Sequence, residues 1–209
     1  MFLLLFWTVI CTIKIISVNK NEIEDKYMRH CGTQTIKTSR LVLRKVELSD
    51  APFMFENWQN DERVCKYLSW NKYENKEQSV GVCKRWLEMY KEDFYLWVIV
   101  LDGIPIGTIS ACQAVEDWSI CEVGYCIGYN WWRKGYTYEA LKSIINFMFI
   151  KVGVKKVVGF CDNRNIGSYQ VMRKCGMKCD GVHYGFKLKE NHICDVLCMS
   201  LEKKDYLRL

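Results

Sequence analysis

In the sequence "IGYNWWRKGYTYEAL", Ile127–Leu141, an apolar, strand-like run passes through a basic turn into a helical pattern. A glycine-containing turn that feeds a helix offers free backbone N–H groups and the positive end of the helix dipole. Arg133 and Lys134 add side-chain charge at the same place. The turn is therefore a candidate phosphate site. Taken alone, it fits equally well an ordinary basic helix N-terminus with Trp131 and Trp132 in the core.

Two well-known phosphate-binding turns do not fit this stretch. A Walker loop needs G-x-x-x-x-G-K-[ST], but Gly128 and Gly135 lie too far apart and Lys134 precedes the second glycine. The dinucleotide pattern G-x-G-x-x-G is also missing. The chemistry of the turn must therefore be judged from the elements around it.

The chain before the turn predicts two helices and then strands. "TSRLVLRKV" from position 38 alternates as a strand, Ser49 and Asp50 predict the N-cap of a helix that runs to about Gln59, and a second helix is expected over Glu77–Tyr90. "FYLWVIV" and "IPIGTISACQ" then flank an Asp-Gly pair, which is a strong hairpin signal. A third strand follows over Ile120–Gly128.

The chain after the turn predicts a crossover. A helix over Thr137–Ile150 with one apolar stripe is followed by the buried strand "KKVVGFC", Lys155–Cys161, which implies a parallel pairing. A helix over Asn165–Cys175 ends at Gly176, and two strands near Val182–Leu188 and Ile193–Leu201 close the chain. The pattern is that of an α+β domain.

Composition and charge limit the class of protein. At 209 residues with 50% hydrophobic content the chain is long enough for one globular domain, and two prolines and 13 glycines argue against linker-rich or collagen-like classes. The net charge of +6 is spread among acidic residues, which favours an anionic small ligand over a nucleic-acid groove. We expect no nucleic-acid partner.

The 12 cysteines do not form a recognisable metal or disulfide pattern. The nearest pairs, Cys175 with Cys179 and Cys194 with Cys198, are spaced C-x3-C rather than the C-x2-C of zinc ribbons. Reduced cysteines that serve as small core hydrophobes are the better interpretation. We therefore expect a cytoplasmic protein with no metal site.

The N-terminus of the chain carries an apolar run. The apolar run Phe2–Ile13 has no basic residue before it, as a secretory signal would, and is shorter than the roughly 20 residues that span a bilayer. The leading hypothesis is that Met28 is the functional start, with residues 1–27 as an extension outside a domain over residues 28–209. A membrane anchor or signal is the alternative, and we rank it second.

Several stretches together resemble a known family. "GYCIGYNWWRKGYTYEALKSIINFMF" followed by "VKKVVGFCDNRNIGSYQVMRKCGM" resembles the GNAT acetyltransferases, within them the RimJ/RimL-like ribosomal-protein N-terminal acetyltransferases. The resemblance runs from about Thr38 to Leu201 and rests on the order of several motifs. It implies the GNAT fold, a mixed, mostly antiparallel sheet of six to seven strands flanked by helices. It also implies transfer of an acetyl group from acetyl-CoA to a primary amine through a ternary complex.

The resemblance also implies where acetyl-CoA binds. The cofactor would lie along one strand, with its pyrophosphate on the turn and its pantetheine arm beside the start of a later helix. Carried over by position, the cofactor-binding residues are Tyr125, Cys126, Ile127, Trp132, Arg133, Lys134, Gly135, Tyr136, Thr137 and Asn165. Thr137 departs from the Gly or Ala of many relatives, and its hydroxyl is interpreted as a helix N-cap or a phosphate donor.

Two residues are the catalytic candidates. Glu122 shares a strand face with Gly124 and Cys126, which places it just upstream of the expected thioester, so it is the candidate base; a salt-bridged or solvent-facing glutamate is the alternative. Ser168 matches the N-x-x-S serine that RimL-like enzymes use to protonate the leaving thiolate, although a serine that merely caps a helix is the alternative. Many GNAT enzymes use a tyrosine where this chain has Met172.

The acceptor amine is not specified by the sequence. RimL-like proteins carry a glutamate before the last strand, and the nearest residue here is Lys187, with Tyr184 and Asp195 as polar candidates that are more often structural. The acceptor is therefore expected to be a protein N-terminus or a small amine, and the protein a monomer or a homodimer. A non-catalytic acetyl-CoA sensor with the same fold is the alternative function.

Overall fold

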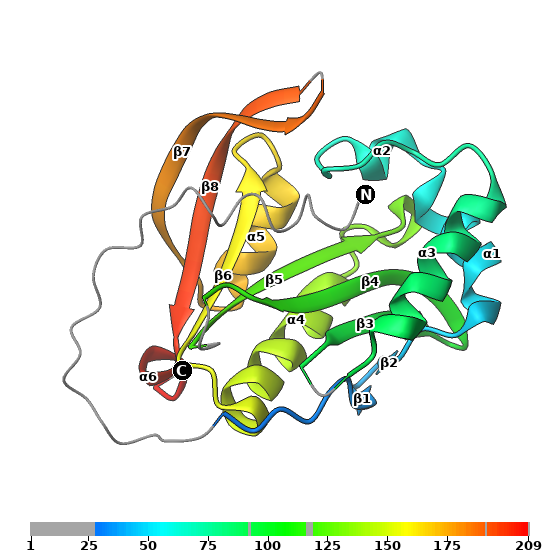
Figure 1. Cartoon of the computed structure of the whole chain (residues 1–209). Helices are drawn as coiled ribbons and strands as arrows, with labels where there is room; N and C mark the ends of the chain where they lie inside the picture. Colours follow the sequence, from blue (N-terminus) through cyan, green and yellow to red (C-terminus); the bar gives the residue numbers. More distant parts are fainter. Residues whose placement is uncertain (1–27, 92, 116–118, 191, 209) are drawn as a thin grey trace.

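A computed structural model describes residues 28–91, 93–115, 119–190 and 192–208. Its centre is one eight-stranded sheet in the order β1-β2-β3-β4-β5-β6-β8-β7 (Figure 1). Neighbouring strands are antiparallel except β5 and β6, which pair in parallel. The expected crossover is confirmed, because α4 connects the two parallel strands.

The elements follow the order expected from the sequence. The strands are β1 Ile36–Lys37, β2 Leu41–Arg44, β3 Tyr95–Leu101, β4 Ile104–Gln113, β5 Ile120–Ile127, β6 Lys156–Asp162, β7 Lys178–Lys189 and β8 His192–Glu202. The α-helices are α1 Ala51–Met54, α2 Glu62–Cys65, α3 Lys76–Met89, α4 Tyr136–Phe147, α5 Ile166–Lys174 and α6 Lys203–Tyr206. The 3₁₀ and π segments are η2 Leu48–Asp50, η3 Phe55–Gln59, η4 Tyr129–Trp131 and η5 Met148–Val152. The sheet has more strands than the six to seven expected, since the two-residue β1 joins its edge.

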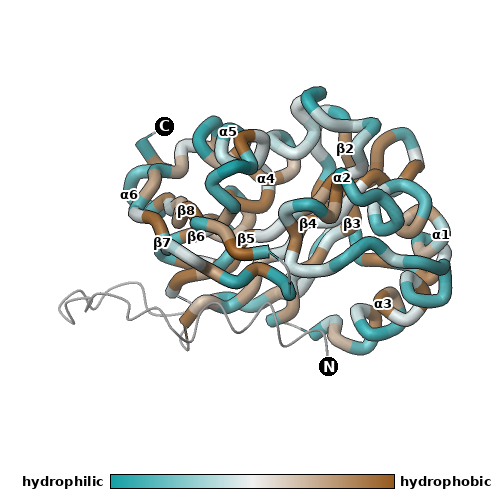
Figure 2. The backbone as a smooth tube through the Cα atoms, turned by 90° about the horizontal axis from the view of Figure 1, so that it is seen from above, coloured by the Kyte–Doolittle hydropathy of each residue, from teal (hydrophilic) through white to brown (hydrophobic). Residues whose placement is uncertain are grey.

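The sheet separates two hydrophobic cores. Helices α4 and α5 cover one face, while α1 and α3 cover the part of the other face made by β2–β4, and Figure 2 shows hydrophobic segments in brown along the strands between them. The larger core lies on the α4 side and contains Trp97, Leu141 and Phe149. Period-two alternation in the strands therefore decides which residues face each layer of helices.

Local turn chemistry explains most element boundaries. Asp102 and Gly103 both have positive φ, of 49° and 81°, as a two-residue hairpin turn requires, which confirms the Asp-Gly prediction. The predicted N-cap is confirmed in position, because Asp50 is the N-cap of α1 and Pro52 lies in its first turn, but the Asp50 side chain makes no capping bond to that helix. Glu47 precedes the helical segment, and the Asp50 carboxylate turns back to accept from the Glu47 N–H at 2.8 Å and pairs with Arg44. Arg44, the last residue of β2, therefore holds the Asp50 carboxylate away from the start of α1.

The proposed extension over residues 1–27 lies outside the described residues, as does the apolar run Phe2–Ile13. From Met28 onward the chain packs on the large core, and the Arg29 N–H donates to the Val152 carbonyl at 2.9 Å. Within the described ranges, no helix has the length and apolar content needed to cross a membrane. The domain start at Met28 stays a prediction.

Candidate active site

The parallel strands β5 and β6 pair over only three residues and then separate. Their last pair is Glu122 with Val158, although β5 continues to Ile127 and β6 to Asp162. The Gly128 N–H donates to the Ile106 carbonyl and the Ala114 N–H to the Ile120 carbonyl, so the even-numbered residues of β5 bond to β4. The odd-numbered residues aim their backbone groups at the opening between β5 and β6, hereafter the β5–β6 gap.

The backbone of Tyr125 faces the β5–β6 gap beyond the last strand pair. The Ile127 N–H faces it too, whereas the Ile127 carbonyl accepts from Trp132 Nε1 at 2.8 Å. The backbone of Cys126 bonds to β4 instead of facing the gap. Its Sγ lies 3.3 Å from Thr108 Oγ1 on the α1–α3 face of the sheet, opposite to the face that carries the Tyr125 side chain. Of the three strand residues expected at the cofactor, Tyr125 and Ile127 offer backbone groups to the gap.

Glu122 stands where the gap begins. It is half-buried on the α1–α3 face, in line with Gly124 and Cys126, as its strand parity predicted. Burial raises the pKa of Glu122 to about 7, and no hydrogen bond or ion pair within the described ranges holds its carboxylate. The salt-bridged alternative for Glu122 therefore has no support within those ranges. A carboxylate with this pKa takes up and releases protons near neutral pH.

Ser168 lies on the opposite face of the sheet, against β5. The hydroxyl of Tyr125 is 2.9 Å from Ser168 Oγ and donates to the Ser168 carbonyl at 3.2 Å. The Ser168 N–H donates to Asn165 Oδ1 at 3.1 Å, so Asn165 is the side-chain cap of α5, rather than Ser168. Burial raises the pKa of the Tyr125 phenol well above its usual range, so the phenol stays protonated. Sequence reasoning placed Tyr125 at the site for its backbone and missed its phenol.

The turn before α4 has the backbone shape that its sequence suggested. Gly135 is the N-cap of α4 with φ of +84°, and Arg133 also has positive φ, of +60°. Among the described residues, and apart from the chain neighbours of Gly135, the only atom within 4 Å of a Cβ added at Gly135 is Arg40 Nη2, at 3.3 Å. Arg133 and Lys134 are exposed, and neither has an ion-pair partner within the described ranges. Open backbone and uncompensated positive charge at a helix N-terminus fit a pyrophosphate group.

Thr137 is not the N-cap of α4, because Gly135 takes that position and Thr137 is the second helical residue. Its hydroxyl has no hydrogen-bond partner among the residues that the structure describes, which leaves the phosphate-donor interpretation open. Trp132 is 37% exposed and packs its ring 5.0 Å from that of Tyr129, so the interpretation that places both tryptophans in the core does not hold for Trp132.

A group of residues that sequence reasoning missed fixes this turn to β2. The Glu139 carboxylate accepts from Thr38 Oγ1 at 2.6 Å, from Ser39 Oγ at 2.9 Å and from Arg40 Nε at 2.7 Å. Arg40 also donates to the Lys134 carbonyl at 3.0 Å. Burial raises the pKa of Glu139, but hydrogen bonds from Thr38, Arg40 and Ser39 outweigh it and lower that pKa to about 2.

The same arginine reaches the ring of the first helical residue. The Arg40 guanidinium lies 4.5 Å from the centre of the Tyr136 ring, a cation–π distance. In the sequence, the signal for these contacts is the presence of both "TSR" and "YEAL" in one chain, although the two motifs lie about a hundred positions apart.

The tip of the β7–β8 hairpin contacts α2 and the segment after it. Lys189 Nζ donates to the Cys65 carbonyl at 2.9 Å, and the rings of Tyr67 and His192 meet edge to face at 6.5 Å. Cys65 lies close to Cys126, so these contacts lie on the α1–α3 side of β5.

The polar candidates of the hairpin, Tyr184, Lys187 and Asp195, take no part in these contacts. Tyr184 is 81% exposed and Lys187 is exposed. Asp195 accepts from the Gly185 N–H at 3.1 Å, which is a structural contact within the hairpin.

Comparison with known proteins agrees with this geometry. A family model described as the acetyltransferase (GNAT) domain matches residues 40–178, and the chain belongs to that family. It is 26% identical over 177 residues to the uncharacterized N-acetyltransferase p20 of Bacillus licheniformis, covering 83% of this chain and 98% of the relative. The protein is accordingly a GNAT N-acetyltransferase.

Solved structures share the fold. An acetyltransferase of the GNAT family from Bacillus anthracis superposes with a TM-score of 0.73 at 22% identity, covering 82% of this chain and 99% of that one. RimL, a ribosomal alpha-N-protein acetyltransferase solved with coenzyme A, superposes with a TM-score of 0.74 at 15% identity, covering 81% and 98%. At these identities the likeness establishes the α+β architecture with its mostly antiparallel sheet.

Proposed function

We propose that this protein transfers the acetyl group of acetyl-CoA directly to a primary amine, with both substrates bound at the β5–β6 gap. One observation carries the proposal: Glu122, with a pKa of about 7, stands at the point where the two parallel strands separate. The acetyl thioester enters the gap from the α4–α5 face, and the amine approaches from the α1–α3 face, where Glu122 lies.

Glu122 is the proposed general base. An amine attacks only in its neutral form, so the proton of the incoming ammonium must leave first. A carboxylate with an ordinary pKa is a weak acceptor at pH 7, and burial without a cationic partner makes Glu122 a stronger one. Once this proton has moved to Glu122, directly or through one water, the bond from nitrogen to the acetyl carbon forms.

The pair formed by Tyr125 and Ser168 is the proposed acid. When the carbon–sulfur bond breaks, the departing thiolate needs a proton. The Ser168 hydroxyl gives it and is resupplied by the Tyr125 phenol at 2.9 Å, which burial keeps protonated before the step. The phenolate then regains a proton from water, and the nitrogen, now bonded to the acetyl carbon, releases its second proton to water. The backbone N–H of Tyr125, aimed at the gap, is placed to stabilise the thioester oxygen. Met172 is buried and carries no proton to donate.

The turn from Arg133 to Thr137 is the proposed pyrophosphate site. Its support is the left-handed Gly135, the exposed charges of Arg133 and Lys134, and the N-terminus of α4. Arg40 and Glu139 hold the turn from behind, so that its backbone N–H groups are oriented before the ligand arrives. Asn165 holds the start of α5, and with it Ser168.

The acceptor is proposed to be a protein N-terminus or a small amine. RimL, by its name, acts on a ribosomal protein, and this chain shares its fold. The carboxylate that RimL-like proteins carry near the last strand is replaced here by exposed Lys187, which weakens the ribosomal assignment. The cytoplasmic location and the monomeric or homodimeric state stay predictions.

A turnover screen tests the function. Purified protein with acetyl-CoA is offered N-terminal peptides, polyamines and aminoglycosides, and release of free coenzyme A is followed together with the mass of each acceptor. We expect thiol release that depends on an acceptor and falls at least tenfold in Glu122→Gln. Binding of acetyl-CoA without turnover over the whole panel would support the sensor alternative instead.

A further inference from the structure

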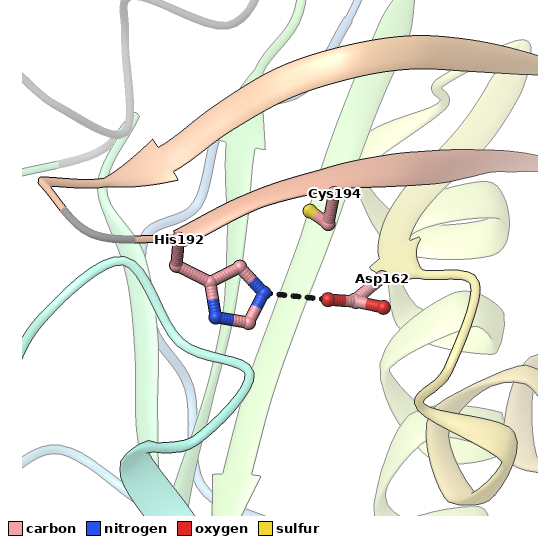
Figure 3. Close-up of side chains that lie close together, drawn as sticks. All are labelled: Asp162, His192 and Cys194. Carbon is pink, nitrogen blue, oxygen red and sulfur yellow. Dashed lines mark hydrogen bonds and ion pairs between the residues drawn. The ribbon is translucent and has the colours of Figure 1, made fainter.

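Three side chains with metal-ligating atoms meet beyond the catalytic candidates, at the carboxyl end of β6. Asp162 is the last residue of β6, and His192 and Cys194 lie two residues apart on β8, so both point to the same face (Figure 3). His192 Nε2, Cys194 Sγ and a carboxylate oxygen of Asp162 all lie within 4.8 Å of one another. Asp162 is fully buried at its side chain, and Cys194 is buried.

One contact in this cluster cannot be satisfied by hydrogen bonds alone. His192 Nε2 lies 2.7 Å from Asp162 Oδ2, an acceptor, and 2.8 Å from Arg164 Nη2, a donor. Nε2 of a neutral imidazole either carries its proton and faces the guanidinium, or lacks it and faces the carboxylate. A protonated ring places two cations together. Each assignment leaves one unfavourable contact.

We propose that Asp162, His192 and Cys194 form a binding site for a zinc-class divalent cation, which takes the place of the Arg164 guanidinium. Carboxylate, imidazole and thiolate are the ligand types that zinc and cobalt(II) share, and water completes the fourth position. To leave, Arg164 must give up the bonds that its Nε and Nη2 donate to the Asp162 carboxylate at 2.9 and 2.7 Å. Water can replace them at the guanidinium, since the Arg164 side chain is 56% exposed and lies in the turn between β6 and α5. The cation then satisfies the Asp162 oxygen and the His192 nitrogen together.

The exchange is balanced in charge and in protons. Before it, the Asp162 carboxylate and the Arg164 guanidinium cancel and the Cys194 thiol is neutral. After it, the dication is cancelled by the carboxylate and the thiolate, while the thiol proton passes to solvent with Arg164 released into water. No net charge enters the buried site, which limits the desolvation cost. Zinc separates its ligand atoms by roughly 3–4 Å, so side-chain shifts of about 1 Å suffice.

A bound cation would join the end of β6 to the start of β8. The same segment carries His192 against Tyr67, which follows α2. The site is therefore placed to fix the contact between the hairpin and α2, and it is separate from Glu122, Tyr125 and Ser168.

Cobalt(II) titration of the reduced full-length protein tests the proposal. Cobalt bound through a thiolate gives a charge-transfer band in the near ultraviolet and, in tetrahedral geometry, intense visible bands. We expect both bands to saturate at one cobalt per chain and to be displaced by zinc. Absence of these bands in the wild-type protein overturns the proposal without any variant.

Variants assign the ligands and the exchange. Cys194→Ser should abolish the thiolate band, whereas the matched control Cys198→Ser, on the same face of β8, should retain it. Arg164→Gln should bind cobalt at least tenfold more tightly, because the competing guanidinium is gone. A band that survives in Cys194→Ser, or affinity in Arg164→Gln equal to or weaker than in the wild type, contradicts the proposal. Circular dichroism checks the fold of each variant.

Discussion

The phenol of Tyr125 on β5 lies 2.9 Å from the hydroxyl of Ser168 on α5, across the opening where two parallel strands separate. The two residues are 43 positions apart in the chain. One is an expected catalytic residue and the other was expected to contribute only backbone. In the proposed mechanism the two hydroxyls therefore act as one proton-donating unit.

Removing either hydroxyl should slow the release of thiol. We expect Ser168→Ala and Tyr125→Phe each to lower kcat by about 10²-fold, as is typical for loss of a general acid. Because the two act in series, the double variant should be little slower than either single one. Steady-state kinetics measure all three, with Tyr206→Phe, which loses one hydrogen bond to Asn146 outside the site, as the control. Fully multiplicative losses would mean that the two hydroxyls act independently.

The pH dependence of turnover should report Glu122. Since its pKa is raised to about 7, kcat/KM should rise with pH through this value as the base loses its proton. Glu122→Gln should lower kcat by about 10²–10⁴-fold and remove this limb, while acetyl-CoA affinity stays the same. Glu88→Gln, an exposed glutamate on α3, is the matched control. An unchanged pH limb in Glu122→Gln would assign the base elsewhere.

Glu122→Gln should lower kcat but raise the free energy of unfolding relative to the wild type as pH rises. The folded-state pKa of Glu122 lies above its ordinary value of 4.5, so its contribution to stability is present below that value and is lost as pH rises through about 7. Glutamine does not ionise, so Glu122→Gln should gain about 1–3 kcal/mol relative to wild type between pH 4 and pH 8. Urea unfolding at the two pH values measures the difference. Equal differences at both pH values would contradict the raised pKa.

Glu139 should behave in the converse way. Its pKa is lowered to about 2, so its contribution is present above its ordinary value and is lost as pH falls through about 2. Glu139→Gln should cost about 1–2 kcal/mol at pH 7, less toward pH 2, and raise the KM for acetyl-CoA by loosening the turn. Urea unfolding and cofactor kinetics test this, with Glu88→Gln again as control. A stability loss without any change in KM would leave Glu139 with a structural role alone.

Much of the architecture could be predicted because it is local. Period-two alternation fixed the face of Glu122, the Asp-Gly pair fixed the hairpin, and Gly135 fixed the start of α4. The long-range contacts could not be read in the same way. Thr38 and Arg40 meet Glu139 only because of the order of the strands in the sheet. Strand order and register are properties of the folded sheet, so the separate motifs do not reveal this contact.

The metal-ligating cluster shows the same limit. Cysteine spacing along the chain gave no zinc pattern. The antiparallel pairing of β6 with β8 instead brings Asp162 beside His192, 30 positions later in the chain. Asp50 precedes α1 as predicted, but its carboxylate does not cap that helix for a local reason that propensity ignores, the guanidinium of Arg44 at 2.8 Å.

Calorimetric titration of acetyl-CoA tests whether the turn from Arg133 to Thr137 binds the pyrophosphate, as we propose. Gly135→Asp places a carboxylate at the backbone that would hold the phosphates, while Gly103→Asp introduces the same acid at a similar φ, +81° against +84°, in the open hairpin turn. We predict that Gly135→Asp weakens binding at least 100-fold and that Gly103→Asp binds as the wild type does. Wild-type affinity in a folded Gly135→Asp protein would contradict the account.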